Sequence, residues 1–296
     1  MSTASFRFFA RLKDFLAPDK RQARMVYPIS GKARVRYPIS GPARVVYPIS
    51  GKDRVRYPIS GKARVRYPIS GPDTVTYSFS GPVSIKHAIE ALGVPHTEVD
   101  LILVNGQSVG FSYMLRSLDQ VSVYPSFSTL ELSPVQQLRE PLDFPLKFIV
   151  DSHLGQLATY LRLLGFDAAY RNDYEDDELA IQAYEQNRIL LTRDRRLLMR
   201  KLIIYGFCLQ TRDPRQQLRD VLHRYQLHNQ IQPWRRCLRC SGRLRPVAKE
   251  EILHRLEPKT RKFYNEFHIC EGCRQIYWKG SHFKPLRHLI EEIMAE

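Results

Sequence analysis

The sequence has 296 residues, of which 43% are hydrophobic, and a formal net charge of +16. This length favours two or three domains over one, and the apolar share is sufficient for sizeable cores. No run of 18 apolar residues occurs, which argues against a membrane span. Charged residues from Arg7 to Asp14 stand where a signal peptide has its apolar segment. We therefore expect a cytoplasmic protein with no membrane partner.

A ten-residue tandem repeat fills residues 23–72 and holds most of the positive charge. Its five units are ARMVYPISGK, ARVRYPISGP, ARVVYPISGK, DRVRYPISGK and ARVRYPISGP. The tract contains eleven Lys or Arg and one acid, Asp53, so it carries +10 of the net +16. The rest of the chain is only mildly basic, and its total charge says little about its activity.

Each unit alternates like a strand and ends in a turn, yet prolines interrupt the alternation and each removes a ladder donor. These are Pro38, Pro48, Pro58 and Pro68. One interpretation is a basic arm whose tyrosines stack on bases. The interpretation we favour is a local duplication that lengthened a surface connection, because closure entropy grows slowly with loop length.

Without the insertion at 23–72, residues 1–128 show the order strand, strand, helix, strand, strand. Ser84 is a suitable N-cap for the helix IKHAIEAL, which ends at Gly93. VDLILVNG and DQVSVYP are strand patterns closed by turn residues. The diverged sixth unit, DTVTYSFSGP, is expected to be the original second strand.

This order, with the phrases ILVNG and LDQVSVYP, resembles the ubiquitin-like β-grasp fold of small sulfur-carrier proteins. Carriers of that type end in Gly-Gly, whereas this chain continues through SFSTLELSPVQQL. The resemblance therefore implies a module that docks a protein partner rather than one that carries sulfur. Residues 129–143 are expected to form a linker.

Residues 144–233 alternate strand and helix patterns, which predicts a parallel α/β sheet with helices on both faces. The expected strands are LKFIVD, FDAAY, RILLTRD and YGFCLQT. The expected helices are HLGQLATYLRLLG, NDYEDDELAIQAYEQN, RDRRLLMRKL and DPRQQLRDVLHRY. A further helical tail is expected at 285–296.

Acidic residues lie where such a sheet forms its sites, beyond the carboxyl ends of the strands. Asp151 and Asp194 end two strands, and Asp176, Asp177 and Glu178 open the helix between them. Hard oxygen ligands of this kind suit Mg²⁺ or Mn²⁺. Taken one by one, the two strand-end acids could instead cap the next helices, and the acidic run could serve its helix dipole.

The stretch from FIVDSHLGQLATYLRLLGFDAAY to RILLTRDRRLL resembles the PIN-like RNase domain of Mut-seven-type exonucleases and of stand-alone bacterial proteins. The similarity extends over about 144–284 and includes a zinc ribbon. It implies a metal-dependent ribonuclease in which Asp151, Asp177 and Asp194 hold Mg²⁺ or Mn²⁺. Asp176 and Glu178 are alternatives to Asp177. Such nucleases usually have a fourth acid; Asp213 is the nearest candidate, although its place at a helix start favours capping.

Basic and aromatic residues suggest contacts with the RNA. Arg193 and Arg195 flank Asp194 and could bind phosphate, or could belong to a solvated helix face. In QIYWKGSHFKPLRH, Trp278 and Lys279 belong to an alternation of aromatic and basic groups typical of single-strand binders. The same residues could instead pack the ribbon.

Four of the five cysteines form two C-x2-C pairs, which predicts a tetrahedral zinc site in a ribbon at 234–284. They are Cys237, Cys240, Cys270 and Cys273. A four-thiolate site is closed, so this zinc is expected to be structural. Disulfides or a redox pair are the alternatives, and a reducing cytoplasm disfavours them. Cys208 is expected to be a core thiol.

The sequence thus predicts a ribonuclease that cleaves RNA phosphodiesters through carboxylate-bound Mg²⁺ or Mn²⁺. The rival hypothesis is a non-catalytic RNA-binding or regulatory adaptor whose ubiquitin-like module docks a partner.

Overall fold

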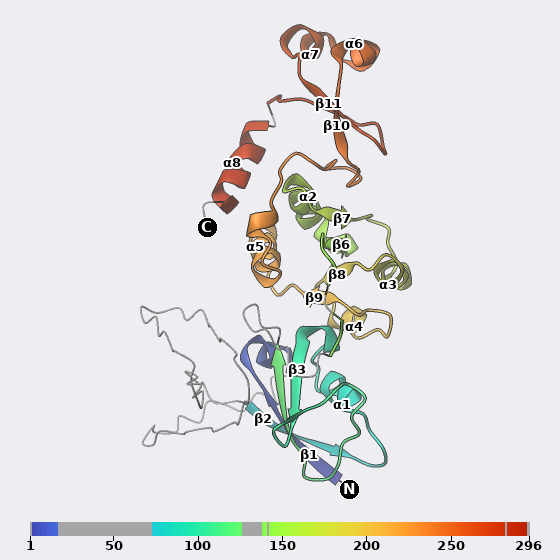
Figure 1. The fold of residues 1–296 in the computed structure, drawn as a ribbon, viewed down its shortest axis with the longest axis vertical. Helices are drawn as coiled ribbons and strands as arrows, with labels where there is room; N and C mark the ends of the chain where they lie inside the picture. Colours follow the sequence, from blue (N-terminus) through green and yellow to red (C-terminus); the bar gives the residue numbers. More distant parts are fainter. Residues whose placement is uncertain (1, 17–72, 126–137, 141, 282, 295–296) are drawn as a thin grey trace, which may run out of the picture. The chain divides into compact units, whose positions relative to one another are not determined.

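Residues 1–140 and 141–296 form two separate units in the computed structural model (Figure 1). The structure describes residues 2–16, 73–125, 138–140, 142–281 and 283–294. Repeat units one to five therefore lie outside the described residues, as does most of the expected linker. No helix in the described ranges has the length and apolar character needed to cross a membrane.

The first unit is a five-stranded mixed sheet crossed by one α-helix. Its elements are β1 (Ser2–Phe8), η1 (Ala10–Phe15), β2 (Asp73–Phe79), α1 (Ile85–Ala91), η3 (His96–Glu98), β3 (Val99–Val104), β4 (Gln107–Ser108) and β5 (Gln120–Pro125). The strand order is β2-β1-β5-β3-β4. β1 runs antiparallel to β2 and parallel to β5. The predicted order is confirmed, and the short β4 is an addition to it.

The sixth repeat unit forms β2, as predicted. Phe6 pairs with Val75 in the β1–β2 register, and both side chains are buried. The predicted cap of α1 is also present, because the Ser84 hydroxyl accepts a hydrogen bond from the His87 amide at 3.3 Å. β2 has a neighbour on one side only and is an edge strand of this sheet.

The second unit contains a four-stranded parallel sheet in the order β7-β6-β8-β9. Its elements are β6 (Lys147–Val150), η4 (Ser152–Leu154), α2 (Gly155–Leu163), β7 (Asp167–Ala169), α3 (Asp176–Glu185), β8 (Ile189–Thr192), α4 (Arg195–Leu198), β9 (Gly206–Cys208), α5 (Pro214–Arg224) and η5 (His228–Gln230). This is the predicted alternation of strands and helices.

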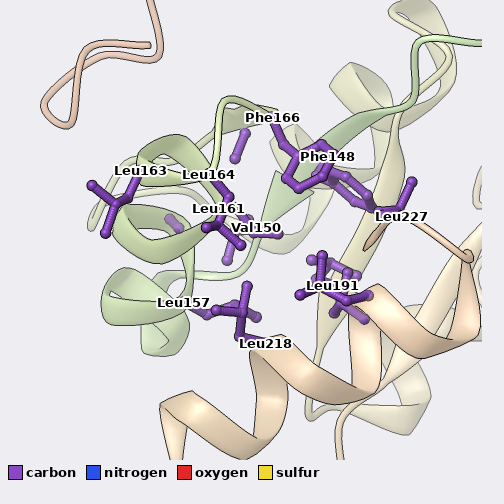
Figure 2. Packing of buried hydrophobic residues seen from close by; sticks show 14 of the residues in the cluster. Phe148, Val150, Leu157, Leu161, Leu163, Leu164, Phe166, Leu191, Leu218 and Leu227 are labelled. Atoms are coloured by element: carbon purple, nitrogen blue, oxygen red, sulfur yellow. The ribbon is translucent and has the colours of Figure 1, made fainter. Parts of the chain in front are cut away.

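Helices cover both faces of this sheet. Phe148, Val150 and Leu191 pack with α2 and α5 in one apolar core. Figure 2 shows these side chains gathered with Leu157 and Leu161 of α2 and Leu218 of α5. Ile149 and Leu190 alternate with them and are also fully buried, on the face that α3 and α4 cover. Burial on both faces explains why the strands are almost continuously apolar.

The ribbon, residues 234–281, starts and ends on this core. It contains β10 (Leu244–Val247), α6 (Lys249–Ile252), η6 (Leu253–Arg255), α7 (Pro258–Phe263), β11 (Phe267–Cys270) and β12 (Ile276–Tyr277), and α8 (Phe283–Met294) follows it. Leu289, Ile290 and Ile293 of α8 join the core of α2 and α5. Phe283 stacks on Trp234 with 4.6 Å between ring centroids, so the residues that begin and follow the ribbon are in contact.

The helix expected over 193–202 is wrong in length, because α4 covers only Arg195–Leu198. The chain turns after Met199. Ile203 is fully buried, and its amide donates to the Arg200 carbonyl at 3.1 Å. A continuous helix would not bring Ile203 into the core while Arg200 reaches the start of α3, so tertiary contacts override the local propensity.

Deletion of residues 32–72 should leave the first unit folded. The deletion joins Gly31 to Asp73 and keeps β1, η1 and β2. It shortens the β1–β2 connection more than twofold, a change worth only ~1 kcal/mol of closure entropy in favour of folding. Thermal unfolding should therefore show an unchanged or slightly raised midpoint. A large loss of stability would show that the repeat contributes to the fold.

Candidate functional site

Asp151 and Asp194 lie at the carboxyl ends of two adjacent parallel strands. Val150 of β6 pairs with Leu191 of β8, and the Asp151 amide donates to the Leu191 carbonyl at 3.0 Å. Asp151 is therefore beside Thr192, the last residue of β8, and Asp194 lies two residues further on. Both strand-end acids therefore lie at the same edge of the sheet.

The Thr192 hydroxyl connects the two acids. It donates to Oδ2 of Asp151 at 2.6 Å and accepts from the Asp194 amide at 2.9 Å. Thr192 is fully buried, and Asp151 is 8% exposed. Ser152 donates to the other Asp151 oxygen at 3.2 Å. A carboxylate withdrawn from water needs such donors, and here they fix its orientation.

The capping alternative applies to Asp194 and not to Asp151. Oδ1 of Asp194 accepts from the Arg196 amide at 2.7 Å and so caps α4. Asp151 precedes η4 without a side-chain capping bond. The Asp194 side chain thus has one oxygen in the cap and, being exposed, can also meet a ligand.

The acids at the start of α3 are held by arginines. Arg200 forms ion pairs with Asp177 and, at 3.4 Å, with Asp176. Glu178 accepts from Arg171 at 2.8 Å. Because Arg200 follows α4, its ion pairs connect the start of α3 with the segment that begins at Asp194. The side chain of Asp177 is 84% exposed.

Asp213 caps α5 by accepting from the Arg215 amide at 3.1 Å, as its place at a helix start favours. Sequence reasoning did not find Thr192 or Arg200. The hydroxyl before Asp194 in LLTRD was a usable signal, since a Thr that ends a strand can bond to a neighbouring turn. No local pattern pairs Arg200 with Asp177.

The four ribbon cysteines form the metal-type cluster of the structure. Their sulfur atoms all lie within 4.8 Å of one another. Among the described residues this is the one set of three or more His, Cys, Asp or Glu ligand atoms gathered so closely. The carboxylates of Asp151, Asp177 and Asp194 are not gathered in this way.

The sulfur geometry fits zinc. The Cys237–Cys273 and Cys240–Cys270 Sγ distances are both 3.5 Å, and all five cysteines are free of disulfides. A ZnS₄ tetrahedron with bonds of about 2.3 Å has sulfur–sulfur edges of about 3.8 Å. The structure therefore favours the metal site over the disulfide alternative. Cys208, at the end of β9, is buried as expected.

Tyr277 contacts this cluster directly. Its hydroxyl lies 3.1 Å from the Cys237 sulfur and accepts from the Leu238 amide at 3.1 Å. Burial alone would raise the pKa of Cys237. The Tyr277 hydroxyl and the amides of Arg239 and Cys240 stabilise the thiolate and bring its pKa down to about 7. Burial raises the pKa of the Tyr277 phenol, which thus stays a donor.

Arg162 of α2 attaches the first cysteine pair to the sheet. Its guanidinium donates to the carbonyls of Ala168, Leu238 and Arg239 at 2.9 to 3.0 Å. Its side chain is buried, and burial lowers its pKa, while the nearby Cys240 and Cys237 oppose that shift. The sheet edge and the ribbon are therefore joined by a charged group that needs these acceptors.

The two ribbon residues expected to contact RNA have protein partners. Lys279 binds Glu266 at 2.7 Å, and Trp278 lies 6.4 Å from the rings of Tyr264 and Phe267. Trp278 is still 39% exposed. Near Asp194, Arg193 is exposed and Arg195 half-buried. The RNA contacts of these four residues stay predictions.

The protein is thus an α/β protein of two units. Its second unit combines a parallel sheet that has acids at its strand ends with a ribbon that holds four clustered cysteines. A family model described as Mut7-C RNAse domain matches residues 146–290, and one described as Mut7-C ubiquitin matches residues 70–131. The chain therefore carries a Mut7-C ubiquitin-type domain ahead of a Mut7-C RNAse domain. No curated protein and no solved structure is significantly similar to it.

Cys270→Ser should remove the metal and destabilise the second unit. Wild type purified without chelator should contain one zinc per chain, and the variant should contain almost none. The melting temperature of the variant should fall by at least about 5 °C, because the ribbon loses its metal and α8 its support. The control is Cys208→Ala, a buried cysteine outside the cluster, which should retain the zinc. Equal zinc in both variants would contradict the assignment.

Thr192→Val should destabilise the protein by about 1–3 kcal/mol, because it removes the donor to a buried carboxylate. Thr192→Ser keeps the hydroxyl and should cost less. Thr211→Val is the matched control, since the Thr211 hydroxyl accepts from the Asp213 amide at 3.1 Å, the same local bond that Thr192 makes to Asp194. Urea unfolding of the three variants measures the difference. Equal losses for Thr192→Val and Thr211→Val would show that the Asp151 bond adds nothing.

Proposed function

We propose that the protein is a metal-dependent ribonuclease that hydrolyses RNA phosphodiester bonds at the edge formed by β6 and β8. The observation that carries this proposal is the hydrogen-bonded link from Asp151 through Thr192 to Asp194. The match of residues 146–290 to the Mut7-C RNAse domain supports a nuclease. RNA as the substrate rests on that family.

In this proposal Asp151, Asp177 and Asp194 hold Mg²⁺ or Mn²⁺. The donor set fits, because all three offer carboxylate oxygens, which these ions prefer. A bound ion of this type activates water and neutralises charge on a scissile phosphate. Asp176, Glu178 and Asp213 are the alternative or additional acids.

Each residue of the site then has a role set by its contacts. Thr192 and Ser152 hold the buried Asp151 in one orientation. The Asp194 amide bond to Thr192 and the cap of α4 fix the second acid. Arg200 keeps Asp177 next to the segment that follows Asp194, and its exposed ion pair is weak enough to be exchanged for a stronger ligand.

The ribbon supports this site and extends the RNA-binding surface. We propose structural zinc on the four cysteines and RNA contacts at Arg193, Arg195, Trp278 and Lys279. We propose a cytoplasmic location, because a reducing compartment keeps such thiols free of disulfides. The ubiquitin-like domain serves to dock a protein partner.

The alternative function is a non-catalytic RNA-binding or regulatory adaptor. The observation that favours it is the pairing of Asp177 with Arg200, which leaves the three carboxylates apart. An adaptor needs the basic surface and the ubiquitin-like domain but no gathered acids, so a cleavage assay separates the two functions.

Asp194→Asn should reduce cleavage of a labelled single-stranded RNA at least about a hundredfold in Mg²⁺ or Mn²⁺. Asparagine caps helices as well as aspartate does, so α4 should remain intact. The control is Asp173→Asn, an exposed acid that pairs with Arg171 and is not one of the proposed metal ligands. It should cleave like wild type.

Two outcomes would contradict the proposal. Equal cleavage by wild type and Asp194→Asn would point to a contaminant or to another site. Absence of cleavage by the zinc-loaded wild type across several RNAs and both metals would favour the adaptor.

A further inference from the structure

The same three residues, Thr-Arg-Asp, occur at the carboxyl ends of two successive strands. They are residues 192–194, of which Thr192 ends β8, and residues 211–213, which begin three residues after Cys208 ends β9. In both turns the threonine hydroxyl accepts from the aspartate amide, at 2.9 Å and 3.1 Å. In both, the aspartate caps the following helix, accepting at 2.7 Å and 3.1 Å. The two turns therefore share their sequence and their internal bonds.

The two turns lie at the same edge of the sheet. β8 and β9 are adjacent and parallel, with Thr192 opposite Cys208 in the register. The Leu209 amide donates to the Thr192 carbonyl at 2.9 Å, which continues the pairing beyond β9. Neighbouring strands are about 4.8 Å apart. The second turn thus follows the strand next to the one that carries Asp194.

The middle residue of each turn is an exposed arginine, Arg193 in one and Arg212 in the other. The threonine and aspartate of each turn are used in its own bonds, whereas the arginines have no ion pair within the described chain. Other arginines of α5 and of the segment after α4 do form ion pairs. Arg200 binds Asp177, and Arg215 and Arg219 both bind Glu292. Two positive side chains thus remain available beside the strand-end acids.

We propose that Arg193 and Arg212 form a phosphate-binding pair that holds the backbone of single-stranded RNA at the β8–β9 edge. This inference rests on the proposed ribonuclease function and adds Arg212 to its substrate-binding residues. Guanidinium groups bind phosphate oxygens with paired hydrogen bonds. Such contacts position the strand without reading its sequence. The pair would place a backbone phosphate beside Asp194.

The test is RNA binding by the full zinc-loaded chain without added Mg²⁺ or Mn²⁺, so that binding is separated from cleavage. The probe is a short fluorescein-labelled single-stranded RNA of mixed sequence, followed by anisotropy at several salt concentrations. The variants are Arg193→Ala, Arg212→Ala and the double variant. Arg215→Ala is the matched control, since it removes an arginine that is also exposed but binds Glu292.

Each single Ala variant should bind several-fold more weakly at low salt, and the double variant weaker still. The slope of log affinity against log salt should fall by about 0.7 for each arginine removed. Arg212→Lys should keep the slope and lose part of the affinity. Arg215→Ala should match wild type in both quantities. If Arg212→Ala melts lower than Arg215→Ala, Arg212→Gln replaces it.

The outcomes separate the pair from the function. If wild type binds RNA and Arg212→Ala keeps the slope and affinity of Arg215→Ala, the pair is overturned while the ribonuclease proposal stands. If wild type binds no single-stranded RNA at all, both are overturned.

Discussion

The candidate site depends on the parallel pairing of β6 with β8 and on the hydroxyl that spans it. Adjacent parallel strands have their carboxyl ends at the same edge of the sheet, so strand pairing alone brings Asp151 and the residues after β8 to one edge. A carboxylate as buried as Asp151 would be costly without donors. Thr192 supplies one and at the same time binds the Asp194 amide. A shift of the β6–β8 register by one residue would break the Thr192–Asp151 bond, because it would send the side chains of one strand to the opposite face relative to the other.

The ribbon acts on this site from the other edge of the sheet. The ribbon begins at Trp234 and is followed by α8, and both pack on the core of the second unit. Arg162 connects the ribbon to β7, because its guanidinium donates both to the Ala168 carbonyl of β7 and to the Leu238 carbonyl between the first two cysteines. The Ser241 hydroxyl adds a second link, because the Ala168 amide donates to it at 3.0 Å. A metal that orders the cysteines therefore also orders an edge strand of the sheet. We expect this metal to be a structural zinc, and because β7 pairs with β6, it would also support the strand that precedes Asp151.

The parallel strands, their acidic ends and the cysteine cluster could be predicted because each produces a local pattern in the sequence. Apolar runs that end in Asp151 and Asp194 mark buried parallel strands and their ends, and two C-x2-C pairs mark a metal cluster. Contacts between residues that are far apart in the sequence produce no such local pattern. The ion pair of Arg200 with Asp177 depends on where the chain turns after α4, and the carbonyl bonds of Arg162 depend on the ribbon's position. For that reason neither the Arg200–Asp177 ion pair nor the Arg162 bonds could be predicted from the sequence. The early end of α4 could not be predicted either.

The sixth repeat unit, which forms the edge strand β2, differs in sequence from the other five copies. Val75 and Tyr77 pair with β1 residues in the register. All five copies keep Tyr at the position of Tyr77, and four keep Val at the position of Val75, where the first copy has Met25. They differ at the position of Ser78, where the copies have proline. Proline cannot donate to a ladder and is tolerated only where the amide would face solvent. The sixth unit keeps every backbone donor along Asp73–Phe79, and its own Gly81-Pro82 turn leads directly to α1. The sequence of this unit is therefore compatible with continuous pairing to β1 along Asp73–Phe79.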